Sequence, residues 1–269
     1  MTLLLAPAAD LYAQPITPTA ARPYAGPRFP GGPDSLQVLL SRAIRFAAST
    51  ATGRMLVQFE LKDNGQPTNY SLIRPPMPLN KPLIEATAHA LDYIEAHMPA
   101  WQPAPPVPPA PGARPDGPPK ITLLLDFPQP DAPVMPYAYA DENPVFATLD
   151  DVLRQQKSPF PYVKQLLADS AGLNKLRTTP EGLLGVLQMQ VRYPVDALRA
   201  NEQGTVYAYL EISPDGTIAQ REVLGSAGRA LDAEVRRVMA SLPKATAPAR
   251  LHGQPVRLYY VLPIRFVRV

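Results

Sequence analysis

Apolar and polar residues alternate along two stretches of the chain, residues 55–61 (MLVQFEL) and residues 205–212 (TVYAYLEI). A period of two is typical of a half-buried strand, because successive side chains point to opposite faces of a sheet. A turn with glycine follows each stretch, at residues 63–65 (DNG) and 214–216 (PDG). Such turns supply the positive φ angles of a tight hairpin. Return strands are therefore expected at residues 67–73 and 218–224.

After each hairpin, apolar residues spaced three and four apart predict a helix, at residues 82–97 and 231–242. Apolar runs at residues 121–127 and 256–267 then predict a last strand for each set. Each set reads strand, strand, helix, strand. This order predicts an α+β fold of two small ββαβ modules, each an antiparallel sheet packed on a helix.

A further helical segment is expected ahead of each set. Residues 35–46 have helical spacing, with Asp34 or Ser35 as the N-cap. Residues 194–200 form a helical turn, in which Pro194 suits the first position.

Glycines recur at the same spacing in both sets. Twelve positions separate Gly53 from Gly65, and twelve separate Gly204 from Gly216. A Gly-x-Pro sequence also precedes each last strand. A repeat of this kind indicates two copies of one module.

Proline makes up 36 of the 269 residues, about 13% against a usual ~5%. The prolines cluster, which favours extended linkers around folded modules. Between the two modules, helices are expected at residues 149–154, 162–168 and 183–191. The predicted divisions are a truncated signal peptide or Pro-rich linker at 1–28, a first module at 29–128, a Pro-rich linker at 129–148, a helical connector at 149–189 and a second module at 190–269.

The first residues, MTLLLAPAADLYAQ, leave two interpretations open. The short apolar run and the Ala13-Gln14 junction resemble a signal peptide whose basic front is missing, and an ordinary N-terminal extension explains them equally well. The chain has no apolar run of 18 or more residues, so no transmembrane segment is expected in it. The net charge of +3 does not by itself indicate a nucleic-acid partner.

Candidate chemistry is sparse. The chain has no cysteine, and His89 and His97 are eight positions apart, whereas a metal pair on a helix needs a spacing of three or four. His252 has no neighbouring ligand in the sequence. Ser226 lies in LGSAG, which lacks the first glycine of a nucleophile elbow, so we expect it to cap the next helix instead. The sequence therefore predicts no catalytic residue, no metal, no cofactor and no enzymatic activity.

The order of several short motifs in the second set resembles the C-terminal domain of TonB-type energy transducers. The resemblance covers residues 190–269, and residues 29–127, from FPGG onward, look like a degenerate copy. The motifs that carry it are Tyr193-Pro194, Gly204-Thr205-Val206, Pro214-Asp215-Gly216-Thr217-Ile218, Leu231-Asp232 and Gly253-Gln254-Pro255-Val256.

The resemblance implies a periplasmic ββαβ domain that binds a short peptide, the TonB box of an outer-membrane transporter. Binding would occur by β-augmentation, in which the peptide adds as a strand to the edge of the last strand. Such a function needs no catalytic side chain. The residues implied to contact the partner are Tyr193, Pro194, Val256, Arg257, Leu258, Tyr259, Tyr260, Val261 and Leu262.

Some positions depart from the family. Its members carry an N-terminal membrane anchor, which is not seen in this chain. The aromatic-Pro element expected after the helix is only Leu242-Pro243 in the second set, and Pro263 would remove one hydrogen bond from the last strand, which an edge position tolerates.

Two hypotheses follow. In the first, the chain is a periplasmic TonB-like protein that binds an extended peptide of an outer-membrane receptor in TonB-dependent transport. In the second, it is a scaffold of the Gram-negative envelope, in which the same strand edge lets the modules pair with each other or with a second chain, including a homodimer partner.

Overall fold

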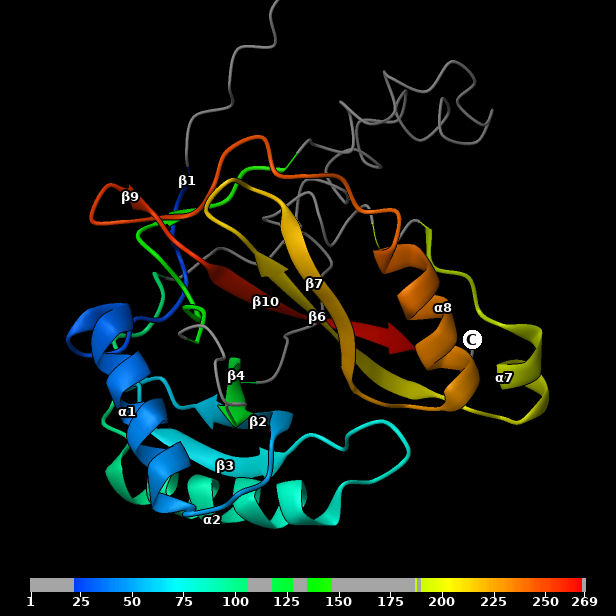
Figure 1. Cartoon of the computed structure of the whole chain (residues 1–269), viewed down its shortest axis with the longest axis horizontal. Helices are drawn as coiled ribbons and strands as arrows, with labels where there is room; N and C mark the ends of the chain where they lie inside the picture. The colour runs from blue at the N-terminus through cyan, green and yellow to red at the C-terminus, as the bar shows by residue number, and fades with distance from the viewer. Residues whose placement is uncertain (1–21, 106–117, 128–134, 147–186, 188–189, 268–269) are drawn as a thin grey trace, which may run out of the picture.

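The computed structural model describes residues 22–105, 118–127, 135–146, 187 and 190–267 (Figure 1). Within these residues the chain forms two modules, each with a three-stranded antiparallel sheet, and a small additional sheet. Helices pack on both three-stranded sheets. The predicted α+β fold class is therefore confirmed.

The first module consists of α1 (Gly32–Phe46), β2 (Gly53–Leu61), β3 (Pro67–Leu72), α2 (Lys81–His97) and β4 (Lys120–Phe127). Its strand order is β3-β2-β4. Both helices pack on one face of this sheet, around a core that includes Leu36, Phe59 and Ile94. The alternation in β2 thus marks a buried face.

The second module consists of α7 (Val195–Arg199), β6 (Gly204–Ile212), β7 (Ile218–Gly225), α8 (Arg229–Met239) and β10 (Leu258–Phe266). Its strand order, β7-β6-β10, is that of the first module. Helix α8 covers one face, with Val235 and Val238 fully buried against Leu210 and Ile264. The repeat seen in the sequence is therefore a repeat of topology.

The turn glycines occupy equivalent places in the two modules. Gly65 has φ 80° and Gly216 has φ 84°, in the left-handed region that favours glycine. The carbonyl of Gly65 accepts the N–H of Trp101, and that of Gly216 accepts the N–H of Ala245, both at 2.9 Å. Each hairpin turn thus holds the segment that follows the module's helix.

The two sheets pack against each other through the faces opposite their helices (Figure 1). Arg54 of β2 adds ion pairs with Asp126 at 3.2 Å and with Glu222 of β7 at 2.6 Å. The scaffold hypothesis had the modules pair through a strand edge, whereas in this chain they pair through sheet faces. The buried apolar contacts come from Leu56, Ile73 and Leu124 of the first module and from Tyr209, Leu224 and Tyr259 of the second.

The interface between the modules should weaken at alkaline pH. The hydroxyl of Tyr259 accepts the N–H of Leu124 at 3.0 Å, and burial raises the pKa of Tyr259 above its ordinary value. In the unfolded chain the tyrosine hydroxyl ionises at about pH 10. The stability that the neutral hydroxyl gives the folded protein is therefore complete below about pH 10, and it is lost as the pH rises towards the folded-state pKa. At about pH 11 this loss is about 1 kcal/mol.

Urea unfolding of the wild type and of Tyr259→Phe, near neutral pH and at about pH 11, measures this effect. The phenylalanine variant is less stable at neutral pH because the N–H of Leu124 loses its acceptor. On going to the alkaline condition, it should lose about 1 kcal/mol less stability than the wild type. Equal losses in the two proteins would contradict the assignment.

Part of the predicted linker at 129–148 is folded. Tyr139 and Ala140 are buried, and the Tyr139 ring stacks on Tyr24 with 4.7 Å between centroids. The proline content predicted an extended spacer, but the aromatic residues between the prolines give this segment an apolar surface to bury. The same region supplies a strand to the small sheet, which consists of β1 (Arg22–Pro23), β5 (Glu142–Asn143), β8 (Arg250–Leu251) and β9 (Gln254–Pro255).

The predicted helix caps need correction. Helix α1 has Gly31 as its N-cap, and Asp34 instead accepts the hydroxyl of Tyr137 at 2.8 Å. Helix α8 has Gly228 as its N-cap, while the Ser226 hydroxyl donates to the carboxylate of Asp232 at 2.6 Å. Both side chains bind within the fold instead of capping a helix end.

Some helices and strands begin or end a few residues from their predicted bounds, and others were predicted in residues that the structure does not describe. Helix α8 ends at Met239, before the expected 242. The last strand begins at Leu258, after the expected 256, because residues 250–255 first form the β8–β9 hairpin. The helices expected at 149–154 and 162–168 and most of the one at 183–191 lie outside the described residues.

Candidate functional site

The last strand, β10, lies at the edge of its sheet, where it pairs with β6 along its whole length. Its other side meets residue 137 at one end: the N–H of Tyr259 donates to the carbonyl of Tyr137 at 3.0 Å, and the N–H of Tyr137 donates to Arg257 at 2.9 Å. Backbone groups alternate in direction along a strand. The odd-numbered residues of β10 therefore direct their N–H and C=O groups away from β6.

This alternation defines an outward-facing edge at Val261, Pro263 and Arg265, which we call the β10 edge. No strand in the described part of the chain pairs with it. Val261 and Arg265 supply N–H donors, and all three residues supply carbonyl acceptors. Pro263 therefore costs no hydrogen bond to β6. As expected for an edge position, the missing N–H removes one donor from the β10 edge only.

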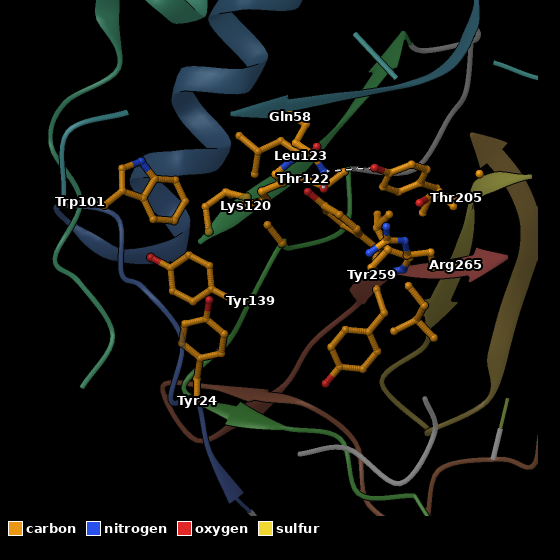
Figure 2. Close-up of a pocket in the computed structure, with 18 residues that line it drawn as sticks. Tyr24, Gln58, Trp101, Lys120, Thr122, Leu123, Tyr139, Thr205, Tyr259 and Arg265 are labelled. Carbon is orange, nitrogen blue, oxygen red and sulfur yellow. Dashed lines mark hydrogen bonds between the residues drawn. The ribbon is translucent and has the colours of Figure 1, made fainter. Parts of the chain in front are cut away.

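A groove of about 1120 Å³ lies along this edge, between β10 and β4 (Figure 2). Lys120 and Thr122 of β4 contribute one wall, and Val261, Pro263 and Arg265 of β10 contribute the other. Aromatic side chains also line it: Tyr24, Trp101, Tyr139, Tyr207, Tyr259 and Tyr260. The groove is thus formed by both modules.

The charged side chains of the groove are basic. Lys120 and Arg265 line it, and none of its lining residues is acidic. The ammonium of Lys120 lies 3.4 Å from the carboxylate of Glu60, which offsets part of its charge. Arg265 is exposed and forms no ion pair with another described residue.

The residues predicted to contact the partner do not all lie on β10. Tyr193 packs edge-to-face on Phe266, with 5.6 Å between centroids, and Pro194 is the N-cap of α7. These two residues therefore lie near the end of β10. Val256 precedes the strand, and its N–H donates to Ala249 at 3.0 Å.

Along β10 itself, the predicted residues alternate in role. Leu258 and Leu262 are buried, and Tyr260 packs partly against the core beneath α8. Tyr259 and Val261 face the first module. Of these residues, Val261 offers both backbone groups at the β10 edge.

Arg257, also predicted as a partner contact, has a structural role. Its guanidinium Nε donates to the buried carboxylate of Glu211 at 3.1 Å. Glu211 is only 2% exposed and also accepts the Tyr209 hydroxyl at 3.0 Å. This arginine therefore neutralises a buried acid in its own module.

Sequence reasoning did not select the first-module wall of the groove. Thr122 lies in the strand predicted at residues 121–127 and Lys120 directly precedes it, but no local pattern indicates that this strand faces β10. Arg265 was not among the residues predicted to contact the partner. The one signal in the sequence for this edge is that Val261, Pro263 and Arg265 occupy alternate positions of the predicted last strand, so their backbone groups point the same way.

The described residues contain no group of three or more histidine, cysteine or acidic residues placed to hold a metal ion. His97 stacks on Tyr93 with 4.0 Å between ring centroids, so the ring is part of the surface of α2. No helix in the described ranges has the length and hydropathy needed to cross a bilayer.

The second module is thus a small α+β domain that exposes backbone groups along its terminal strand. Residues 189–267 match the model of the family described as Gram-negative bacterial TonB protein C-terminal. This part of the chain is therefore similar to that family, as its motifs predicted. No curated protein and no solved structure matched the chain.

The family match gives the second module a TonB-like role in TonB-dependent transport. TonB C-terminal domains are non-enzymatic parts of energy transducers, act in the Gram-negative periplasm and interact with outer-membrane receptors. The match does not extend to the first module.

Proposed function

We propose that this chain is a non-enzymatic periplasmic protein that captures an extended peptide by strand addition at the β10 edge. The peptide would be the TonB box of an outer-membrane transporter. Backbone hydrogen bonds would supply the affinity, as in other β-augmentation complexes. The observation that carries the proposal is the outward direction of the Val261 and Arg265 backbone groups beside a groove.

The bound strand would pair over a short stretch. Tyr137 already occupies the edge next to Tyr259, so pairing would begin at Val261. Pro263 has no N–H, and the peptide carbonyl opposite it would face solvent or the groove. Arg265 would provide the second donor.

The first module would be a divergent copy of the same domain. Its strand order and its turn glycine, Gly65, match those of the second module. Its sheet face is covered by the second module, and its own last strand, β4, would serve as a wall of the groove.

The test uses Val261→Pro in the full chain, with Val261→Ala as the matched control. Proline removes the N–H from the β10 edge without breaking a bond to β6, whereas alanine shortens the side chain and keeps the N–H. A TonB-box peptide should shift the amides of Val261 and Arg265 in the wild type. Proline should weaken binding at least about tenfold, the cost of one hydrogen bond whose partner stays buried.

The control separates binding from folding. Thermal unfolding and amide dispersion report whether each variant is folded. Equal peptide affinity for the folded proline and alanine variants would contradict strand capture at this edge. A chain that forms a dimer through β10 and shows no peptide shifts would instead support the scaffold hypothesis.

A further inference from the structure

We propose that the groove between β4 and β10 selects peptides with an acidic side chain, and that the first module forms half of this site. The inference rests on the proposed capture of a strand at the β10 edge. It adds the chemistry of the partner and a role for the module that the family match does not cover. Arg265 would contact the acidic group, with Lys120 as a weaker second cation.

The direction of the side chains supports this assignment. Side chains of a strand alternate between its two faces, and Tyr259 and Val261 of β10 pack against the first module. Arg265 has the same parity, so its side chain lies on the face that borders the first module. It lines the groove there (Figure 2).

The opposite wall comes from β4 by the same reasoning. Leu124 packs against the second module, and Lys120 and Thr122 share its parity. The Thr122 hydroxyl accepts the side-chain amide of Gln58 at 2.8 Å, which fixes this wall. A strand bound to β10 would therefore have side chains of both modules around it.

The charges point to an acidic partner. The groove has two cations and no acidic lining residue, so a carboxylate would enter without meeting a like charge. Lys120 already forms an ion pair with Glu60, whereas Arg265 forms none with a carboxylate among the described residues. Charge-assisted hydrogen bonds to arginine are stronger than neutral ones, and the aromatic walls would partly shield such a contact from water.

The test compares two short, capped peptides that differ only by glutamate or glutamine at the centre, titrated into the full chain. We expect the glutamate peptide to bind about twofold to fivefold more tightly, the range of a partly exposed ion pair. The variant Arg265→Gln should remove this preference, and Lys120→Gln should reduce it less. The matched control Arg229→Gln changes an exposed arginine outside the groove and should keep the preference.

The outcomes distinguish this inference from the proposed function. If both peptides shift the Val261 and Arg265 amides with equal affinity, strand capture stands and acidic selection is overturned. If the shifts spare Lys120 and Thr122, the role of the first module is overturned. If neither peptide shifts the β10 amides, strand capture itself fails and this inference fails with it.

Discussion

Replacing Gly65 by alanine should lower the free energy of unfolding by about 3 kcal/mol, since it combines backbone strain with steric overlap. Gly65 has φ 80°, and an added β-carbon would overlap the carbonyl oxygen of Trp101. That carbonyl belongs to backbone and cannot rotate away as a side chain can. The turn would have to open, and the hydrogen bond from Trp101 to Gly65 would be lost.

The matched control is Gly32→Ala. Gly32 has nearly the same φ, 79°, but an added β-carbon there meets no atom within 4 Å. This variant should therefore show the conformational cost alone, about 1 kcal/mol. In the second module, Gly216→Ala should fall between the two, because its β-carbon would lie 2.8 Å from the carbonyl oxygen of Ala245.

Urea denaturation of the three variants measures these differences. Equal losses for Gly65→Ala and Gly32→Ala would show that the close approach to Trp101 does not constrain the turn. The equivalence of the two modules would be contradicted if Gly216→Ala left the stability unchanged.

Replacing Glu211 by alanine should cost about 3 kcal/mol, because it leaves the Arg257 guanidinium without its carboxylate. Glu211 is 2% exposed and lies on β6, opposite Tyr259 of β10. The Tyr209 hydroxyl loses an acceptor in the same variant. The loss should appear in the free energy of unfolding in urea.

Two further variants test the cause. The double variant Glu211→Leu with Arg257→Met removes both charges and should recover much of the stability, since an apolar pair can replace a buried ion pair. Arg199→Ala removes an exposed pair with Asp196 and should change stability by no more than about 0.5 kcal/mol. A double variant as unstable as Glu211→Ala alone would show that the ion pair is not the cause.

Arg257 also separates stability from binding. The resemblance to TonB domains implied that it contacts the partner, whereas its side chain binds Glu211 within the module. Folded Arg257→Met protein should therefore bind a TonB-box peptide about as well as the wild type. Loss of binding in the folded variant would return Arg257 to the set of partner contacts.

Local patterns in the sequence were sufficient to predict the elements and their order. The alternation in β2 and β6 predicted both hairpins because a strand's side-chain period is a local property. The glycines at 65 and 216 marked turns for the same reason, since positive φ depends on the residue itself. The shared order of elements, together with a few motifs, was enough to predict the family of the second module.

Local patterns did not indicate which surfaces these elements cover and which they leave for a partner, because this depends on how the two modules pack. The stacking of the two sheets, the burial of Tyr139 in a Pro-rich segment and the ion pair of Arg257 with Glu211 all join residues far apart in the chain. Contacts of this kind depend on shape complementarity between folded modules and leave no periodic signal in the sequence. The groove between Lys120 and Arg265 exists for the same reason, because it forms only when β4 of one module packs beside β10 of the other.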